Sequence, residues 1–256
     1  MKFDKEEIIS IAGEDLEKDT IQGSPHFEWI DLVGIPQRPK ELEKNLFFTS
    51  HSTGEGGWND PFDRRPIAEA VYRDKGWPLV IESGLEIGGA EYLQVRSLDV
   101  LAKRVYEAAR DRTNPYVVGV TGSVGKTTSV AFLEHLLKTS GEKVSRFYSK
   151  RLTPLSVMCH YINRVDENTS FVVMEYSAYM KEHVSELSQL LPPNISFLTN
   201  IYATHINPGS FTSKEETFDS KKHIKPSDSL GFVNARTLRE LGLVNPTGWV
   251  PFEIEF

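Results

Sequence analysis

YVVGVTGSVGKTTS, residues 116–129, joins a short apolar run to a glycine-rich turn and to the start of a helical pattern. Gly125-Lys126-Thr127-Thr128 stands where the helix would begin. Strand, glycine-rich turn and helix in this order form a phosphate-binding loop. The strict pattern G-x-x-x-x-G-K-[ST] is not met, because it requires glycine at position 120, where this chain has valine. The stretch therefore predicts a variant phosphate-binding loop.

The chain downstream of this loop alternates between strand and helix patterns. A helical segment at 127–141 is followed by apolar runs at 170–177 and 194–201. Continuous apolar strands joined by helices indicate a parallel sheet that is covered on both faces. Ligands of such sheets bind at the carboxyl ends of the strands, so we expect the loop, Glu175 and His205 along one edge.

The chain upstream of the loop predicts a smaller α/β unit. Ile67, Ala70 and Val71 lie at helical spacing before Gly76, and Ser97 is a candidate N-cap for a second helix. Strand-like runs are NLFF at 45–48, PLVIES at 78–83 and EYLQVR at 91–96. The polar segment RDRTNP at 110–115 is the expected linker.

The predicted fold class is therefore α/β with two domains. Residues 1–112 are expected to form a small N-terminal α/β domain. Residues 113–256 are expected to form a P-loop-type domain with a mostly parallel sheet and helices on both faces.

Composition excludes several classes of protein. The 256-residue chain has a formal net charge of −7, which argues against a nucleic-acid-binding surface. Its one cysteine, Cys159, excludes an internal disulfide and a four-cysteine zinc site. The acidic, polar N-terminus does not resemble a secretory signal, and no apolar run approaches the roughly 20 residues of a membrane helix. We expect a cytoplasmic protein without nucleic-acid or membrane partners.

The residue types in the loop fit a nucleotide phosphate. Glycines at 119, 122 and 125 would leave backbone N–H groups accessible, and Lys126 would neutralise the β- and γ-phosphates. The Thr127 hydroxyl and the Glu175 carboxylate are oxygen ligands of the kind that Mg²⁺ prefers. The alternatives are a glycine-rich turn without chemistry and an exposed glutamate at a strand end.

The segment TNIYATHINPGSFTSKEETFDSKKHI, residues 199–224, follows the third predicted strand. Ser213 and Glu216 have the spacing of a capping box for a short helix that carries Lys221 and Lys222. From spacing alone, a surface histidine at 205 and a solvated lysine face are favoured over functional roles.

The loop resembles that of the Mur ligase family, the ATP-dependent ligases of peptidoglycan synthesis and their relatives. The family pattern G-x-T-G-[ST]-x-G-K-T-[TS] is matched by GVTGSVGKTT at every specified position. The variant form is thus explained by one additional loop residue. The resemblance implies that ATP contacts Gly119, Thr121, Gly122, Ser123, Gly125, Lys126, Thr127 and Thr128.

Other segments extend the resemblance. VVMEYSA is similar to the family strand that ends in a metal-binding glutamate, which implies that role for Glu175. LTNIYATHINPGSF resembles the segment with a metal-binding histidine, which implies His205. DSKKHI lies where the family has a carbamylated lysine, best matched by Lys221 with Lys222 as the fallback. GFVNAR resembles a segment near the nucleotide base, which implies that Asn234 contacts ATP.

Residues 45–83 resemble the first domain of the family branch that adds D-Ala-D-Ala, where that domain holds a uridine nucleotide. The branch's D-S-R and D-G-H motifs are absent, and its asparagine-rich stretch appears here as YSKRLTPLSV. The sequence given ends soon after Asn234, so we expect an incomplete central ATP-binding domain in residues 113–256 and no C-terminal domain.

The resemblance implies an ATP-dependent carboxylate–amine ligase of Mur type that forms an amide bond through an acyl phosphate in a specialised pathway. Its substrates would be ATP, a small-molecule carboxylate and an amine, with Mg²⁺ as cofactor. Lys126, His205 and Lys221 are the expected catalytic residues, and the expected metal ligands are Thr127, Glu175, His205 and Lys221. Two alternatives stay open: an ATP-binding subunit that needs a partner protein or a homo-oligomer to complete its site, and a P-loop ATPase or phosphotransferase.

Overall fold

The computed structural model describes residues 2–32, 45–48, 65–147, 152–178, 180–203 and 210–253. The chain forms two compact units. The first unit comprises Met1–Thr113 and Leu155–Glu167, and the second comprises Asn114–Pro154 and Asn168–Phe256. Neither unit is continuous in sequence, because one helical segment from the second half of the chain belongs to the first unit.

The first unit is built on a five-stranded sheet with the order β2-β7-β6-β5-β4. Strands β4, β5, β6 and β7 are parallel, and β2 is antiparallel to β7. A separate antiparallel pair joins β1 and β3. The strands are β1 (Phe3–Asp4), β2 (Leu16–Asp19), β3 (His26–Phe27), β4 (Trp29–Asp31), β5 (Asn45–Phe48), β6 (Leu79–Glu82) and β7 (Tyr92–Val95). The helices are α1 (Lys5–Ala12), the 3-10 turn η1 (Gly13–Asp15), α2 (Arg65–Lys75), α3 (Leu98–Asp111) and α5 (Pro154–Arg164).

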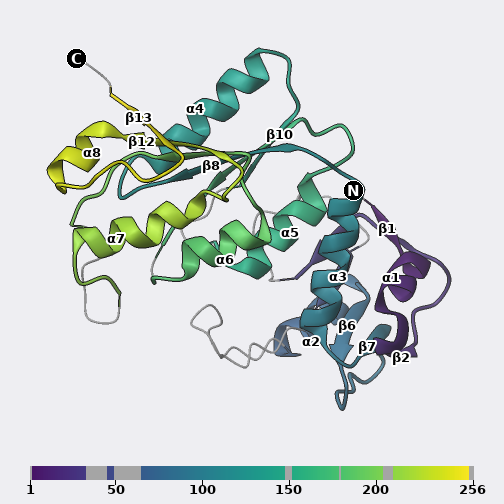
Figure 1. The fold of residues 1–256 in the computed structure, drawn as a ribbon. Helices are drawn as coiled ribbons and strands as arrows, with labels where there is room; N and C mark the ends of the chain where they lie inside the picture. Colours follow the sequence, from purple (N-terminus) through teal and green to yellow (C-terminus); the bar gives the residue numbers. More distant parts are fainter. Residues whose placement is uncertain are drawn as a thin grey trace. The chain divides into compact units, whose positions relative to one another are not determined.

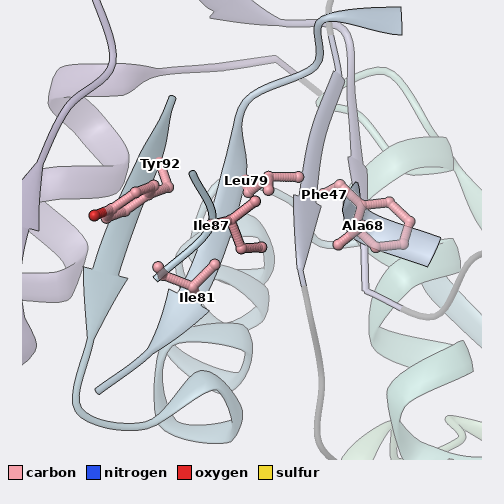
Figure 2. Packing of buried hydrophobic residues seen from close by; sticks show 6 residues of the cluster. All are labelled: Phe47, Ala68, Leu79, Ile81, Ile87 and Tyr92. Carbon is pink, nitrogen blue, oxygen red and sulfur yellow. The ribbon is translucent and has the colours of Figure 1, made fainter. Parts of the chain in front are cut away.

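One hydrophobic cluster of this unit joins α2 to the sheet, and Figure 2 shows its buried members. The helix contributes Ala68, which is fully buried, with Val71 and Tyr72 packed against the cluster. The helix predicted from the spacing of Ile67, Ala70 and Val71 is present, and Ile67 is 40% exposed. Ala68, Val71 and Tyr72 follow the i, i+3, i+4 spacing of one helix face, so the buried face is rotated by about one residue. The buried members of the cluster are Phe47, Ala68, Leu79, Ile81, Ile87 and Tyr92.

Two further helices of this unit are fixed by specific contacts. Ser97 caps α3 as expected, since its side chain accepts a hydrogen bond from the Val100 N–H. Helix α5 lies against β4, the edge strand of the sheet: the Asn163 amide accepts from the Ile30 N–H at 2.9 Å and donates to the Ile30 carbonyl at 2.8 Å. The Tyr161 hydroxyl is 2.8 Å from that of Thr113. Helix α5 thus satisfies backbone groups that an edge strand otherwise leaves unpaired.

The second unit contains a six-stranded, fully parallel sheet with the order β13-β12-β11-β8-β10-β9. Its strands are β8 (Tyr116–Thr121), β9 (Val144–Phe147), β10 (Phe171–Glu175), β11 (Ile195–Leu198), β12 (Leu230–Asn234) and β13 (Trp249–Phe252). Its helices are α4 (Lys126–Thr139), α6 (His183–Leu190), α7 (Lys214–Lys221), the 3-10 turn η2 (Lys222–Ile224) and α8 (Ala235–Glu240). Figure 1 shows α4 on one side of this sheet and α6 and α7 on the other.

Apolar residues on both faces of β8 explain its central place in this sheet. Val118 and Val120 pack with Val130 of α4 and Val173 of β10 in one cluster. On the strand between them, a Cβ added at Gly119 would lie 2.9 Å from Pro193 Cγ and 3.0 Å from a Tyr176 ring carbon. Gly119 is therefore a packing residue inside a strand, and the loop proper begins after Thr121.

Parallel register places several strand ends at one edge of the sheet. Glu175 at the end of β10 is in register with Val120 of β8, and Leu198 at the end of β11 is in register with Thr121. Strand β12 ends at Asn234 on the same edge. The predicted α/β fold, with a mostly parallel sheet covered by helices, is confirmed. Among the described residues, no helix is both long and apolar enough to traverse a lipid bilayer.

Candidate active site

The loop between β8 and α4 lies at the carboxyl edge of the parallel sheet. Gly122 has a φ of 146° and Gly125 a φ of 84°, conformations that L side chains rarely adopt. Gly125 occupies the N-cap position of α4, so the next N–H groups, from Lys126 onward, have no partner within the helix. These N–H groups and the positive end of the helix dipole favour an anion at this point.

Glu175 is buried beside the start of α4, and each of its carboxylate oxygens is hydrogen-bonded. Thr127 Oγ1 donates to Glu175 Oε2 at 2.7 Å, and Ser177 Oγ donates to Oε1 at 2.7 Å. The side chain is only 6% exposed, so these bonds offset much of the cost of burying its charge. A threonine hydroxyl and a carboxylate in contact form the oxygen-rich arrangement that Mg²⁺ prefers.

Lys126 completes a charged group at the loop. Its ammonium nitrogen lies 3.8 Å from Glu175 Oε1 and donates to the Ser123 carbonyl at 3.2 Å. Burial lowers the pKa of Lys126, and the charge of Glu175 opposes this shift. The side chain is held back over the loop, where its charge can meet an incoming phosphate.

Lys221, the last residue of α7, is buried with 3% exposure. The pKa of Lys221 is lowered to about 7, chiefly by burial and also by the charge of Lys126, while the charge of Glu175 opposes the shift. The three charged groups are therefore close enough to interact. Lys222 differs: its ammonium pairs with Asp219 at 2.7 Å, and its side chain is 38% exposed. The structure thus places Lys221 beside the loop cluster and Lys222 on an exposed face of the turn.

The start of α7 is only partly as expected. The Ser213 side chain accepts from the Glu216 N–H at 3.1 Å, which is half of the predicted capping box. The Glu216 carboxylate instead accepts from the N–H and hydroxyl of Thr212 and pairs with Lys181. The Ser213 cap still fixes where α7 begins, and in the resulting helix the Lys221 side chain is buried.

Asn200, which lies in the segment at residues 199–224 but was given no role from the sequence, holds the loop in place. Asn200, just after β11, bonds to Val124 through both ends of its side-chain amide, and its carbonyl accepts from the Ser123 N–H at 2.9 Å. The Ser123 hydroxyl bonds to backbone groups of Tyr202. The available signal was the position of Asn200 directly after a strand that ends at the same sheet edge.

A cavity of about 380 Å³ lies beside the loop and is lined mainly by apolar side chains. Asn234 lines it from the end of β12, and its Oδ1 accepts from the Arg236 N–H at 2.9 Å. Mostly apolar cavities of this size with a few polar groups are typical of small-molecule sites. Its walls come from the loop, α4 and four strand ends: Val120, Val124, Gly125, Ser129, Phe132, Leu133, Phe197, Thr199, Asn200, Asn234 and Phe252.

The remaining predicted site residues have varied positions. Thr121 is fully buried and its hydroxyl donates to the Tyr176 carbonyl at 2.7 Å, so it joins two strands instead of facing the loop. Thr128 is exposed in the first turn of α4. His205 lies outside the described residues. Within the described ranges, no three His, Cys, Asp or Glu side chains are grouped so that they could hold a metal ion.

Segments of this chain are similar in sequence to known proteins. Residues 120–237 match the family model "Mur ligase middle domain". The UDP-N-acetylmuramoyl-L-alanyl-D-glutamate–2,6-diaminopimelate ligase of Clostridium tetani is 27% identical over 206 residues, which cover 72% of this chain and 38% of the relative. The UDP-N-acetylmuramoyl-tripeptide–D-alanyl-D-alanine ligase of Buchnera aphidicola is 25% identical over 112 residues, 44% of this chain and 24% of the relative.

Solved structures agree with the fold. MurF from Acinetobacter baumannii superposes with a TM-score of 0.72 at 16% identity, over 99% of this chain and 53% of that one. The MurF ligase of Thermotoga maritima, solved with ADP, gives 0.62 at 22% identity, over 82% of this chain and 47% of that one. This chain thus spans less than two thirds of the length of each of these relatives. Residues 120–237, which carry most of the loop and its neighbouring strands, therefore match the middle domain of the Mur ligase family.

Proposed function

We propose that the chain is part of an ATP-dependent carboxylate–amine ligase, whose loop at residues 122–128 binds the phosphates of Mg–ATP. The observation that carries the proposal is the cluster at the start of α4, where Thr127 and Lys126 both meet the buried carboxylate of Glu175. The match to the Mur ligase middle domain supports the reaction class, since the relatives named above are ligases of muramoyl peptides.

In the proposed reaction, a substrate carboxylate oxygen attacks the γ-phosphorus of ATP. The bond from this phosphorus to the bridging oxygen breaks, and ADP leaves. The amine nitrogen then attacks the acyl carbon, inorganic phosphate leaves, and the nitrogen loses a proton to solvent. The loop N–H groups and the Lys126 ammonium orient the transferring phosphoryl group and offset its charge, which is where catalysis of such transfers chiefly lies.

The residues present fit magnesium. The bound ion would neutralise charge on the phosphate oxygens. Thr127 and Glu175 would hold it, and His205 is proposed as a further ligand from the family resemblance. Lys221 is proposed to carry a carbamate, because a buried amine with a lowered pKa is neutral often enough to react with CO₂. The neutral amine releases one proton as the N–C bond forms, so the change from the ammonium cation to the carbamate anion releases two protons in all and leaves an anionic oxygen ligand.

The nucleoside would occupy the 380 Å³ cavity beside the loop. Asn234 supplies a polar group there, and aromatic walls from Phe132, Phe197 and Phe252 offer apolar contact to a base. The acid substrate is proposed to be a nucleotide-linked peptide acid, as in the names of the relatives, and the amine to be an amino acid or a short peptide.

Calorimetry with Mg–ADP tests the nucleotide site directly. The unmodified chain should bind Mg–ADP, and Lys126→Ala should weaken binding by roughly 10- to 100-fold, the usual effect of losing a hydrogen bond to a charged group. Lys222→Ala is the matched control: it also removes one ammonium group, but one paired with Asp219 on the surface, and should leave binding unchanged. Equal affinities in all three proteins would contradict the assignment.

Phosphate release from ATP separates the proposed ligase from the other functions. A ligase releases phosphate only when both an acid and an amine substrate are present. Release that ignores both substrates would identify an ATPase instead. Nucleotide binding without release under any substrate combination would favour an ATP-binding subunit.

A further inference from the structure

We propose that Asn200 is a positioning residue that fixes the phosphate loop in the conformation that receives a polyphosphate. This inference rests on the proposed function, because it assigns a role within the nucleotide site. Asn200 is a neutral side chain, and the proposal gives it no contact with the reacting atoms.

Asn200 holds Val124 by both polar atoms of its side chain. Val124 N–H donates to Asn200 Oδ1 at 2.9 Å, and Asn200 Nδ2 donates to the Val124 carbonyl at 3.0 Å. The backbone of Asn200 adds a third bond, since its carbonyl accepts from the Ser123 N–H at 2.9 Å. A single residue, Asn200, therefore holds the loop by three hydrogen bonds.

Neighbours of Asn200 extend this attachment. Thr199 Oγ1 lies 3.2 Å from the carbonyls of both Thr121 and Val124. On the other side, the Tyr202 N–H donates to Ser123 Oγ at 2.9 Å. Gly122 allows the loop and Thr199 to lie this close together, because a Cβ at this position would lie 2.1 Å from Thr199 Oγ1. The two segments fit together only with glycine at this position.

These bonds decide which loop amides can face a ligand. The N–H groups of Ser123 and Val124 point to Asn200, whereas those of Lys126 and Thr127 begin α4 and have no partner within the helix. Without the Asn200 amide, Val124 loses two hydrogen bonds and keeps the one from Thr199 Oγ1, so the loop gains access to other conformations. The apparent dissociation constant then rises in inverse proportion to the fraction of chains with a competent loop.

The test compares AMP and ADP, each with Mg²⁺, on the full chain. The dissociation constant for AMP divided by that for ADP reports contacts to the second phosphate. This ratio cancels effects on the nucleoside cavity, which Asn200 also lines. Asn200→Ala should reduce this ratio by roughly 10-fold, as expected for the loss of two hydrogen bonds that hold the loop. Hydrogen exchange of a peptide spanning residues 121–125 should become faster in the same variant.

Asn194→Ala is the matched control. Its side-chain Oδ1 accepts from the Val117 N–H at 2.7 Å, at the opposite end of the same strand pair, β8 and β11. It should lower thermal stability but keep the ratio and the exchange of residues 121–125 unchanged.

The outcomes separate the two proposals. If the unmodified chain binds ADP no better than AMP, the proposed function is wrong and the role of Asn200 falls with it. If the unmodified chain prefers ADP and Asn200→Ala keeps that preference, only the positioning role is wrong. An equal reduction of the ratio in Asn200→Ala and Asn194→Ala would also overturn it, because a general loss of stability would then explain both.

Discussion

Gly122 and Gly125 have different reasons to be glycine, although both lie in the same loop with positive φ. A Cβ at Gly122 would meet Thr199 Oγ1 at 2.1 Å, whereas a Cβ at Gly125 would meet nothing within 4 Å. The first position combines an unfavourable backbone conformation with an overlap, and the second has only the unfavourable conformation.

We predict that Gly122→Ala lowers the free energy of unfolding by about 2–4 kcal/mol and that Gly125→Ala lowers it by about 1–2 kcal/mol. Urea denaturation followed by circular dichroism measures both values. Gly141→Ala is a control outside the site, since Gly141 has a φ of 92° and open space around it. Equal losses at positions 122 and 125 would show that the overlap with Thr199 is relieved at no cost.

Lys221 gives the stability of the chain a pH dependence. Its pKa in the folded chain is about 7, below the ordinary value of 10.5 that it regains on unfolding. Between these values unfolding takes up a proton, so the free energy of unfolding rises with pH. A shift of this size corresponds to about 2 kcal/mol between pH 7 and pH 9.

Lys221→Met should therefore stabilise the chain more at pH 7 than at pH 9, with the advantage shrinking by about 2 kcal/mol over this range. Denaturant unfolding in CO₂-free buffer measures the effect without carbamate formation. Lys222→Met, which changes an exposed lysine, should show no such trend. Parallel stability profiles for the unmodified chain and Lys221→Met would refute the assignment.

Edge strand β4 depends on helix α5 for its backbone hydrogen bonds. Asn163 satisfies both the N–H and the carbonyl of Ile30, a residue that is 2% exposed. Buried backbone groups without partners are costly, so this one side chain stabilises the edge of the sheet more than its size suggests.

Asn163→Ala is expected to lower the free energy of unfolding by about 2–4 kcal/mol, because it leaves the Ile30 N–H without its partner and the Ile30 carbonyl with the weaker contact from Cys159 Sγ at 3.5 Å. Asn245→Ala serves as the comparison, since Asn245 makes one bond, from Nδ2 to the Trp249 carbonyl at 2.8 Å. Its expected cost is about 1 kcal/mol. Chemical denaturation ranks the two, and a similar cost for both would mean that Ile30 finds water or another partner.

Elements were predictable from sequence where the pattern is local. The apolar run of β8, the glycines and the helix after Lys126 are contiguous, and the predicted strands at 170–177 and 194–201 contain β10 and β11. The buried face of α2 does not follow from the spacing alone, because Ile67 and Ala68 differ by one helix position and only packing decides which of them is covered.

Other features depend on contacts between distant residues, so local patterns could not supply them. Asn200 meets Val124 across 76 positions of sequence, and Asn163 meets Ile30 across 133. The choice between Lys221 and Lys222 came from an alignment; the structure separates them because one points inward at the end of α7 and the other outward.

At the scale of the whole molecule, the two units are interleaved in sequence, since each unit is made of two segments of the chain. Residues Leu155–Glu167 lie in sequence between strands of the second unit but belong to the first. A cut at residue 113 would thus remove α5, with its buried residues Val157, Cys159 and Ile162, from the sheet that it completes.

We predict that a fragment of residues 1–113 lacks the cooperative unfolding transition of the intact first unit, since it loses the helix that pairs Ile30. Joining residues 155–167 to residue 113 through a flexible glycine–serine linker should restore that transition. Thermal unfolding followed by circular dichroism compares the two fragments. A cooperative transition in the shorter fragment alone would show that α5 is dispensable.

The path of the chain through α5 also bears on biosynthesis. The ribosome synthesises β8, α4 and β9 before α5, the helix that covers the edge strand of the first unit's sheet. Residues 1–113 therefore cannot complete the first unit while they are the only part of the chain outside the ribosomal exit tunnel. The edge of its sheet stays uncovered until α5 has emerged, which is after the loop at residues 122–128 but before strands β10 to β13 of the second unit.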